Sequence, residues 1–287
     1  MEKVAAPFLL GALLLAGAAC APPRAPALPS GTGTPFAGFE AAYDEAVREC
    51  RSARTLVAEL GLSGRAGDTK LRGRISAGFA APSGIRLEGV AFGRAIFILV
   101  SENDDATLLL LRENRVVRDA PPEAIVEALA GVALTPAELR AAVAGCGLGA
   151  ATPANGRMVT DEWAAVDAGG GVTYLRRVDE RWRVGGGVRG RITIVYSDFT
   201  GGLPGTIHVR SAAPGSAPVA DIALRVSQLE INTDIDPKAF DVNVPPDAMP
   251  LSLDELRKAG PLGGDRAGSD QGQTRARPEP APGQTGV

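Results

Sequence analysis

The sequence predicts a mainly β domain with helices (α+β), in which a curled antiparallel sheet surrounds a helical plug. Short segments in which apolar residues alternate with polar ones recur along the chain, and turn-forming residues separate them. The composition agrees, with 36 glycines, 22 prolines and 5% aromatic residues in a chain of 287. Helical patterns interrupt the strand series once, in its middle, instead of following each strand, which argues against βαβ units. A net charge of −3 gives no basic footprint for nucleic acid.

The chain begins with an apolar run that indicates export. Lys3 precedes this run, which covers residues 4–19 and is too short and too rich in Ala and Gly for a bilayer span of ~20 strongly apolar residues. We expect residues 1–19 to be a signal peptide. Residues Gly17-Ala18-Ala19-Cys20 resemble the lipobox of bacterial lipoproteins, with Gly17 where Leu is usual, and the resemblance implies lipid attachment at Cys20. The alternative is cleavage at the A-x-A pattern Ala16-Gly17-Ala18, which leaves Cys20 unmodified.

Two polar segments flank the expected folded body. Residues 20–35 are rich in Pro, Gly, Ser and Thr and predict a flexible tether behind the anchor. Residues 263–287 predict a disordered polar tail. Between these segments, residues 36–262 are numerous enough to bury a core, so we expect a single domain there.

The folded body is expected to begin with a helix and to continue as a strand meander. Apolar residues at helical spacing, among them Phe39, Tyr43 and Val47, predict one amphipathic helix over residues 36–54. From residue 55 the period changes to two, which predicts strands on both sides of a turn at Ala66-Gly67-Asp68. Further strands are expected at residues 85–88, 95–100, 107–111 and 115–117.

Two helices then interrupt the meander. The first is expected over residues 121–130, where Gly131 ends it. The second begins at Thr135-Pro136-Ala137-Glu138, a capping box with Pro in the first helical position, and ends near residue 144. After a long connection over residues 148–161, strands are expected in residues 162–234. A short last helix over residues 252–257 starts with Ser252 and Glu255 in capping-box spacing.

The polar residues form no recognisable catalytic or metal-binding set, so we expect no catalytic residue, no metal, no cofactor and no enzyme activity. His208 is the one histidine, and a lone histidine in a strand pattern lacks the partners that triads and metal sites need. No Cys or His spacing fits zinc, and neither G-x-S-x-G nor H-E-x-x-H occurs. Turn formation explains the cluster Asn103-Asp104-Asp105 better than a calcium site, which needs about six to eight converging oxygens.

The three cysteines suggest one lipid anchor and one disulfide. If Cys20 carries lipid, Cys50 and Cys146 remain as a possible pair in an oxidising compartment. Such a bond would join the first helix to the end of the pair of helices expected over residues 121–144. In the chain-entropy model it would stabilise the fold by ~4 kcal/mol.

Two unbroken apolar runs occur within the alternating meander. Residues 96–100 and 108–111 are apolar at every position. A strand that is wetted on one face alternates, so continuous runs indicate that both faces are covered, one by helices and the other by a second layer or a ligand. Ordinary core packing stays open as the explanation for most of these side chains.

A family resemblance is carried by the order of elements in residues 86–147 and by the closing segment FDVNVPPDAMPLSLDEL. Residues 86–147 have the sequence RLEGVAFGRAIFILVSENDDATLLLLRENRVVRDAPPEAIVEALAGVALTPAELRAAVAGCG. They contain an apolar-Gly loop between strands, a hairpin, a helix ending in LAG and a Pro-led helix ending near Gly. From about residue 54 to residue 256 the chain resembles the LolA/LolB-like outer-membrane lipoprotein family.

The resemblance implies an incomplete β-barrel plugged by helices, with an apolar cavity that accepts the acyl chains of lipoproteins. It also implies a protruding loop, here Val90-Ala91-Phe92-Gly93, from which Phe92 inserts into the membrane. The other interpretation of Phe92 is a buried loop anchor. The candidate cavity residues, taken from the strands and helices of this region, are Leu87, Phe97, Leu99, Leu109, Leu111, Ile125 and Leu129.

The expected function is that of a lipid-anchored protein of the bacterial outer membrane that faces the periplasm. It would bind the acyl chains of lipoproteins, or a related lipid, and help to deliver or insert them. The expected partners are the membrane, the acylated cargo and a periplasmic carrier protein, and we expect a monomer. The alternative is a structural or assembly lipoprotein that docks a cell-envelope protein complex without lipid transfer.

Overall fold

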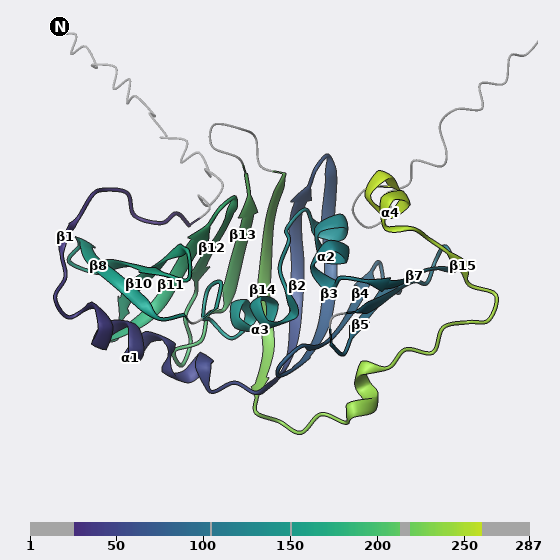
Figure 1. Ribbon diagram of the computed structural model, residues 1–287, viewed down its shortest axis with the longest axis horizontal. Coiled ribbons are helices and arrows are strands. Elements are labelled where there is room, and N and C mark those ends of the chain that lie inside the picture. Colours follow the sequence, from purple (N-terminus) through teal and green to yellow (C-terminus); the bar gives the residue numbers. More distant parts are fainter. Residues whose placement is uncertain (1–25, 104, 150, 213–218, 260–287) are drawn as a thin grey trace, which may run out of the picture.

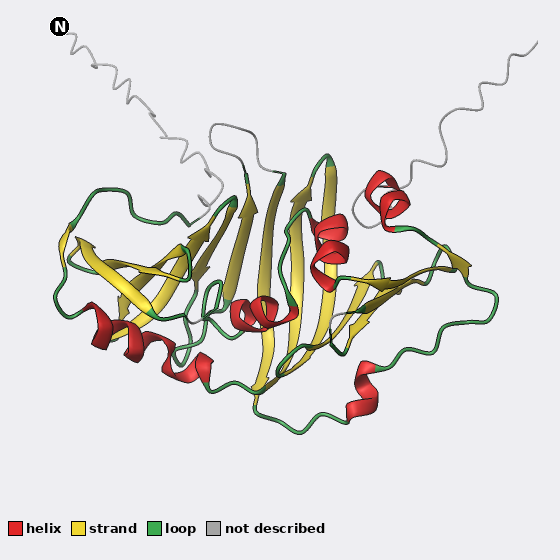
Figure 2. Ribbon diagram, in the orientation of Figure 1, coloured by secondary structure: helices red, strands yellow, loops and turns green. Residues whose placement is uncertain are grey.

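The computed structural model describes residues 26–103, 105–149, 151–212 and 219–259. The expected signal peptide (1–19), the lipid attachment at Cys20 and the polar tail (263–287) lie outside the described residues. Within them, one curled sheet carries helices along its inner side and at its ends (Figure 1, Figure 2).

The sheet has fifteen strands among the described residues and does not close. Each strand pairs antiparallel with its neighbours, except that β15 runs parallel to β7. The fold class predicted from the sequence, a curled sheet forming an incomplete barrel, is confirmed. In spatial order the strands are β1 (Thr34–Pro35), β8 (Pro153–Thr160), β9 (Trp163–Ala168), β10 (Gly171–Val178), β11 (Arg181–Arg189), β12 (Ile192–Ser197), β13 (Thr206–Ser211), β14 (Ala220–Ile231), β2 (Thr55–Ala66), β3 (Thr69–Ala80), β4 (Gly84–Ala91), β5 (Arg94–Ser101), β6 (Ala106–Leu110), β7 (Arg115–Ala120) and β15 (Met249–Pro250).

The centre of the sheet is where the two meanders meet. β14 pairs with β2 over almost their whole lengths, from Ala220 opposite Ala66 to Ile231 opposite Leu56. Strands of 12 residues on both sides of this pairing, β2, β3 and β14, form the long middle of the sheet. Apolar and polar side chains alternate in each of these strands, and their pairing gives the middle of the sheet one apolar inner face, although β14 lies far from β2 and β3 in sequence.

The predicted capping signals are present at α2, α3 and α4, whereas α1 is shorter than the helix expected over residues 36–54 and α4 extends past residue 257. α1 (Phe39–Arg51) packs on β8 and β11 through its apolar side. α2 (Pro122–Ala130) ends at Gly131, whose left-handed backbone is the usual helix stop. α3 (Pro136–Val143) starts with the complete Thr135–Glu138 capping box, and α4 (Leu253–Ala259) with the Ser252–Glu255 pair. A short 3-10 helix, η1 (Pro237–Phe240), was not expected.

The connection expected over residues 148–161 contains strand β8 instead of being a plain link. Its sequence offers few apolar residues and a Pro start, so its period is weak. Gly156 explains its place, because a side chain there would meet the Cβ atom of Phe39 at 2.1 Å. α1 therefore rests directly on the β8 backbone. The last two residues of the expected tether form β1 and pair with β8.

The end of α3 is held by a disulfide to α1 and by hydrogen bonds to a buried tyrosine. A disulfide connects Cys50, at the end of α1, to Cys146, just after α3, with 5.6 Å between their Cα atoms. Next to it, the buried Tyr196 hydroxyl donates to the Ala142 carbonyl (2.7 Å) and accepts from the Gly147 N–H (2.9 Å). Burial raises the pKa of Tyr196 far above its usual value, so this hydroxyl stays protonated.

The apolar runs are largely covered on both faces, although Leu111 at the end of the second run is exposed. Phe97 and Leu99 of β5 face the inner cluster with α2, whereas Val100 on the opposite face is also buried. On that outer face the chain after β14 is anchored to β4, because Arg86 donates to the carbonyls of Ala239 and Asp241, both at 2.9 Å. The segment around η1 thus forms part of a second layer.

Candidate functional site

An apolar cavity lies between the inner face of the sheet and helices α2 and α3. It has a volume of about 130 Å³, and we call it the apolar chamber. Every side chain that lines it is aliphatic or a phenylalanine. The lining residues are Leu60, Leu62, Leu71, Ile75, Phe79, Leu87, Phe97, Leu99, Val126, Leu129, Ala130, Val132, Leu134, Leu139, Val143, Val209, Ile222 and Leu224.

The chamber exists because the plug does not fill the curve of the sheet. Strand alternation points Leu60, Leu71 and Phe79 inward, and they are buried. Leu62 and Leu224, on the same inner face, are only partly buried although they pack against the core. Leucines at the inner side of a sheet that remain partly exposed mark an unfilled apolar surface, which is unusual within a close-packed domain.

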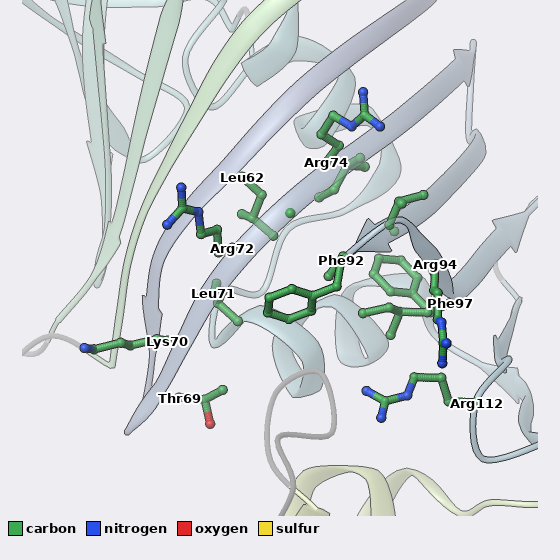
Figure 3. A pocket seen from close by; sticks show the side chains of 16 residues that line it. Leu62, Thr69, Lys70, Leu71, Arg72, Arg74, Phe92, Arg94, Phe97 and Arg112 are labelled. Atoms are coloured by element: carbon green, nitrogen blue, oxygen red, sulfur yellow. The ribbon is translucent and has the colours of Figure 1, made fainter.

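A second, wider hollow lies next to the chamber. This outer hollow has a volume of about 450 Å³ and shares four residues of its wall with the chamber, namely Leu62, Leu71, Ile75 and Phe97. It opens between the β2–β3 hairpin and the β4–β5 hairpin (Figure 3). Its other lining residues include five bases and no acid: Lys70, Arg72, Arg74, Arg94 and Arg112.

Phe92 stands at the tip of the β4–β5 hairpin, beside the outer hollow (Figure 3). The two-residue turn has positive φ at both Phe92 (51°) and Gly93 (73°), as in a type I′ hairpin. Asn or Asp is the usual residue at the first of these positions, and an aromatic there is a conformational outlier. The Phe92 side chain is 96% exposed. It is therefore not a buried loop anchor.

The hairpin that carries Phe92 is bent at its base. A register shift separates Gly89 from Val90, where β4 pairs with β5. The Phe97 ring occupies the space above Gly89, so that an added Cβ atom would lie 2.1 Å from the ring. A bulge increases local twist and re-aims the strand end, so this feature directs the hairpin tip. Val90 and Ala91 end β4 and line the outer hollow.

The cavity residues expected from the sequence divide into two sets. Leu87, Phe97, Leu99 and Leu129 line the apolar chamber. Leu109, Leu111 and Ile125 do not. Alternation places Leu109 on the opposite face from Leu108, which is in the inner cluster. Leu111 lies in a turn and is 36% exposed. Ile125 is fully buried in the cluster of α2 and β5–β7.

Most of the chamber wall was missed by sequence reasoning. Val209 of β13 and Ile222 and Leu224 of β14 come from the second meander, more than 100 positions after β3 in the chain. Their alternation was visible in the sequence as a strand signal. Nothing local indicates that β14 pairs with β2, and this pairing brings them to the chamber.

One partly buried ion pair supports the helix that closes the chamber. Glu138 caps α3 and accepts a hydrogen bond from Arg189 of β11. Burial raises the pKa of the Glu138 carboxyl, but hydrogen bonds from Arg189 and Thr135 outweigh that effect and hold the pKa below its usual value. Leu139 and Val143 of this helix line the chamber, so the pair fixes part of its wall.

His208 lies half-buried on the face of β13 opposite to the chamber residue Val209. Burial lowers the pKa of His208, and the negative charges of Asp221 and Asp198 oppose that effect in part. Among the described residues, no cluster of three or more His, Cys, Asp or Glu side chains could hold a metal ion. No helix in the described ranges has the length and apolarity that a membrane span requires.

Comparisons with known proteins find likeness only among solved structures. No family model matches the chain, and no curated protein matches it. A LolA superfamily protein from Nitrosomonas europaea has a TM-score of 0.43 at 11% identity, covering 70% of this chain and 94% of that one. A DUF1329 family protein from Desulfovibrio piger has a TM-score of 0.43 at 12% identity, covering 70% and 96%. The Mycobacterium tuberculosis lipoprotein LppX has a TM-score of 0.31 at 10% identity, covering 69% and 98%. These scores and identities are too low to assign the chain to a family.

Proposed function

We propose that this protein is a lipid-anchored carrier that holds an acyl chain in the apolar chamber and helps to deliver or insert acylated cargo into the outer membrane. The observation that carries the proposal is the chamber itself, which is wholly apolar, unfilled, and shares part of its wall with the outer hollow. Chamber and hollow together fall in the range of ~300–1,000 Å³ that is typical of ligand pockets.

The energetics favour an acyl chain as ligand. Burial of apolar surface gives about 0.8 kcal/mol per methylene, so about ten buried methylenes supply roughly 8 kcal/mol before the cost of immobilising the ligand. A wall without polar groups gives no directional contacts. Such a wall selects ligands by apolarity and width, as a carrier for acyl chains of different cargo requires.

Phe92 provides the second part of the proposal. An exposed ring at the tip of a hairpin can enter the bilayer, and its burial there contributes about 2 kcal/mol of membrane affinity. The hairpin borders the outer hollow, so the ring would enter the membrane where the bound chain leaves. Lipid attachment at Cys20 would hold the carrier at the periplasmic side of the outer membrane, and the segment behind it would act as the tether.

The test uses the soluble form that begins at Ala21. It should bind a fluorescent apolar probe saturably, and a triacylated lipopeptide should displace the probe. A variant that fills the chamber, Leu62→Trp, should weaken probe binding at least tenfold, because Leu62 lines both chamber and hollow.

Leu229→Trp is the matched control, since Leu229 is a partly buried leucine of the same sheet that lines neither space. It should bind the probe as the unmodified protein does. Absence of saturable binding, or equal loss in both variants, would contradict the carrier proposal and leave the assembly lipoprotein as the better explanation.

A further inference from the structure

We propose that the outer hollow docks on an anionic bilayer surface through a ring of basic side chains around Phe92. These are Lys70, Arg72, Arg74, Arg94 and Arg112, which we call the basic collar. The inference extends the proposed function, since it names the membrane chemistry that the carrier recognises. It assumes from that proposal only that Phe92 enters a bilayer.

The first argument is local charge. The chain as a whole has a net charge of −3, but the 16 residues that line the outer hollow include five bases and no acid. Anionic lipids attract basic residues near their surface, and the attraction is worth about fivefold in binding for each Lys or Arg. A basic region on an acidic protein also orients the approach, so that the hollow faces the membrane first.

The second argument is that four of the five collar side chains are not used by the fold. Some arginines elsewhere on the sheet pair with carboxylates, as in Arg157–Asp167, Arg183–Glu49 and Arg189–Glu138. Within the described ranges, the side chains of Lys70, Arg72, Arg74 and Arg94 form no hydrogen bond or ion pair, and all four are exposed. Their charges are therefore available to an external partner.

The third argument is the direction in which the collar side chains point. Figure 3 shows Lys70 and Arg72 pointing away from the outer hollow on one side, whereas Arg94 and Arg112 lie together on the other side, with the Phe92 ring between the two groups. A pocket for a single headgroup needs donors that converge on one point. Donors that spread around an exposed aromatic tip match an extended anionic surface, in which the ring reaches the acyl layer and the bases stay at the headgroups.

The consequence for transfer is that docking would seal the outer hollow against the bilayer. An acyl chain could then move between the chamber and the membrane past Leu71 and Phe97, without crossing bulk water. The collar would thus act on the same path as the chamber.

The experiment measures cosedimentation of the soluble form that begins at Ala21 with vesicles. One set of vesicles is phosphatidylcholine alone, and the other contains about one third phosphatidylglycerol. The protein should bind the anionic vesicles much more strongly, and high salt should remove the difference. The triple variant Arg72→Gln, Arg74→Gln, Arg94→Gln should lose about a hundredfold of the binding to anionic vesicles.

The control triple variant is Arg48→Gln, Arg181→Gln, Arg191→Gln, which removes the same charge from exposed positions that do not line the outer hollow. Its vesicle binding should stay within about threefold of the unmodified protein. Equal loss in both triples would overturn the collar in favour of a net-charge effect. Equal binding to both kinds of vesicle would also overturn it. A collar triple that keeps vesicle binding but no longer binds a short-chain soluble phosphatidylglycerol would assign the bases to a cargo headgroup and refute membrane docking.

The apolar probe assay on the same variants separates this inference from the proposed function. Normal probe binding by the collar triple shows that the variant is folded and that the chamber is intact. If vesicle docking depends on the collar while the probe never binds, the docking surface stands and the carrier proposal fails. If the probe binds and docking ignores the collar, the carrier proposal stands and this inference fails.

Discussion

Replacing Phe92 by Asn should move fold stability and membrane binding in opposite directions. Phe92 occupies the first position of the two-residue turn, with φ of 51°, and its ring is 96% exposed. The left-handed conformation costs an L residue about 1 kcal/mol, which Asn largely avoids through its short polar side chain. Because the exposed ring contributes almost no packing, Phe92→Asn should raise the free energy of unfolding by about 1 kcal/mol.

The same change should weaken vesicle binding. Loss of a buried phenylalanine ring costs about 2 kcal/mol of membrane affinity, which corresponds to about a 30-fold weaker partition. Urea unfolding and vesicle cosedimentation of the soluble form that begins at Ala21 measure the two quantities. Met249→Gln removes another exposed apolar side chain, 57% exposed on β15, and should leave partition unchanged. A Phe92→Asn protein that is less stable, or that binds vesicles as before, would refute the reasoning.

Three further predictions concern the supports of the chamber. Replacing Cys50 and Cys146 by Ser should lower the free energy of unfolding by about 4 kcal/mol, since the bond closes a loop with a sequence separation of 96. If the unmodified protein has the same urea midpoint under reducing and non-reducing conditions, this prediction is wrong. Tyr196→Phe should lower the free energy of unfolding, measured with urea, by about 2 kcal/mol, because the Gly147 N–H and the Ala142 carbonyl both lose a buried partner. A change below about 0.5 kcal/mol would mean that water replaces the hydroxyl. Glu138→Gln keeps a capping residue but removes the charge facing Arg189. The folded pKa of Glu138 is lowered, so its contribution to stability is present above the ordinary carboxyl pKa and lost as pH falls through the folded value. The variant should therefore be less stable at neutral pH and equal to the unmodified protein in acid; a pH-independent difference would contradict the assignment.

Local signals predicted the elements well because their causes are local. Gly131 ends α2 through its left-handed backbone, and Thr135 with Glu138 starts α3 through hydrogen bonds three positions apart. Alternation in β2 and β3 likewise needs only neighbouring residues. Strand β8 was not predicted because its place depends on contact between Gly156 and Phe39, which lie far apart in sequence.

The candidate site could be predicted only in part for the same reason. Leu87, Phe97, Leu99 and Leu129 line the chamber, and they belong to one continuous stretch of chain. Leu109 was assigned to the cavity because an unbroken apolar run does not show which face of a strand each side chain takes. The exposed position of Phe92 was one of two interpretations, since a sequence does not tell whether an apolar loop residue meets protein or solvent.

The two ends of the open sheet are built alike. β1 and β15 contain two residues each, and each ends in a proline, Pro35 and Pro250. Proline offers no N–H to a further strand, and so short an edge gives an incoming chain little to pair with. A barrel removes its edges by closing, but closure would fix the curvature of the sheet around the chamber. Short edge strands that end in proline provide the other solution. With them the sheet can remain open and adjust its curvature, and a second copy has little to pair with at either edge.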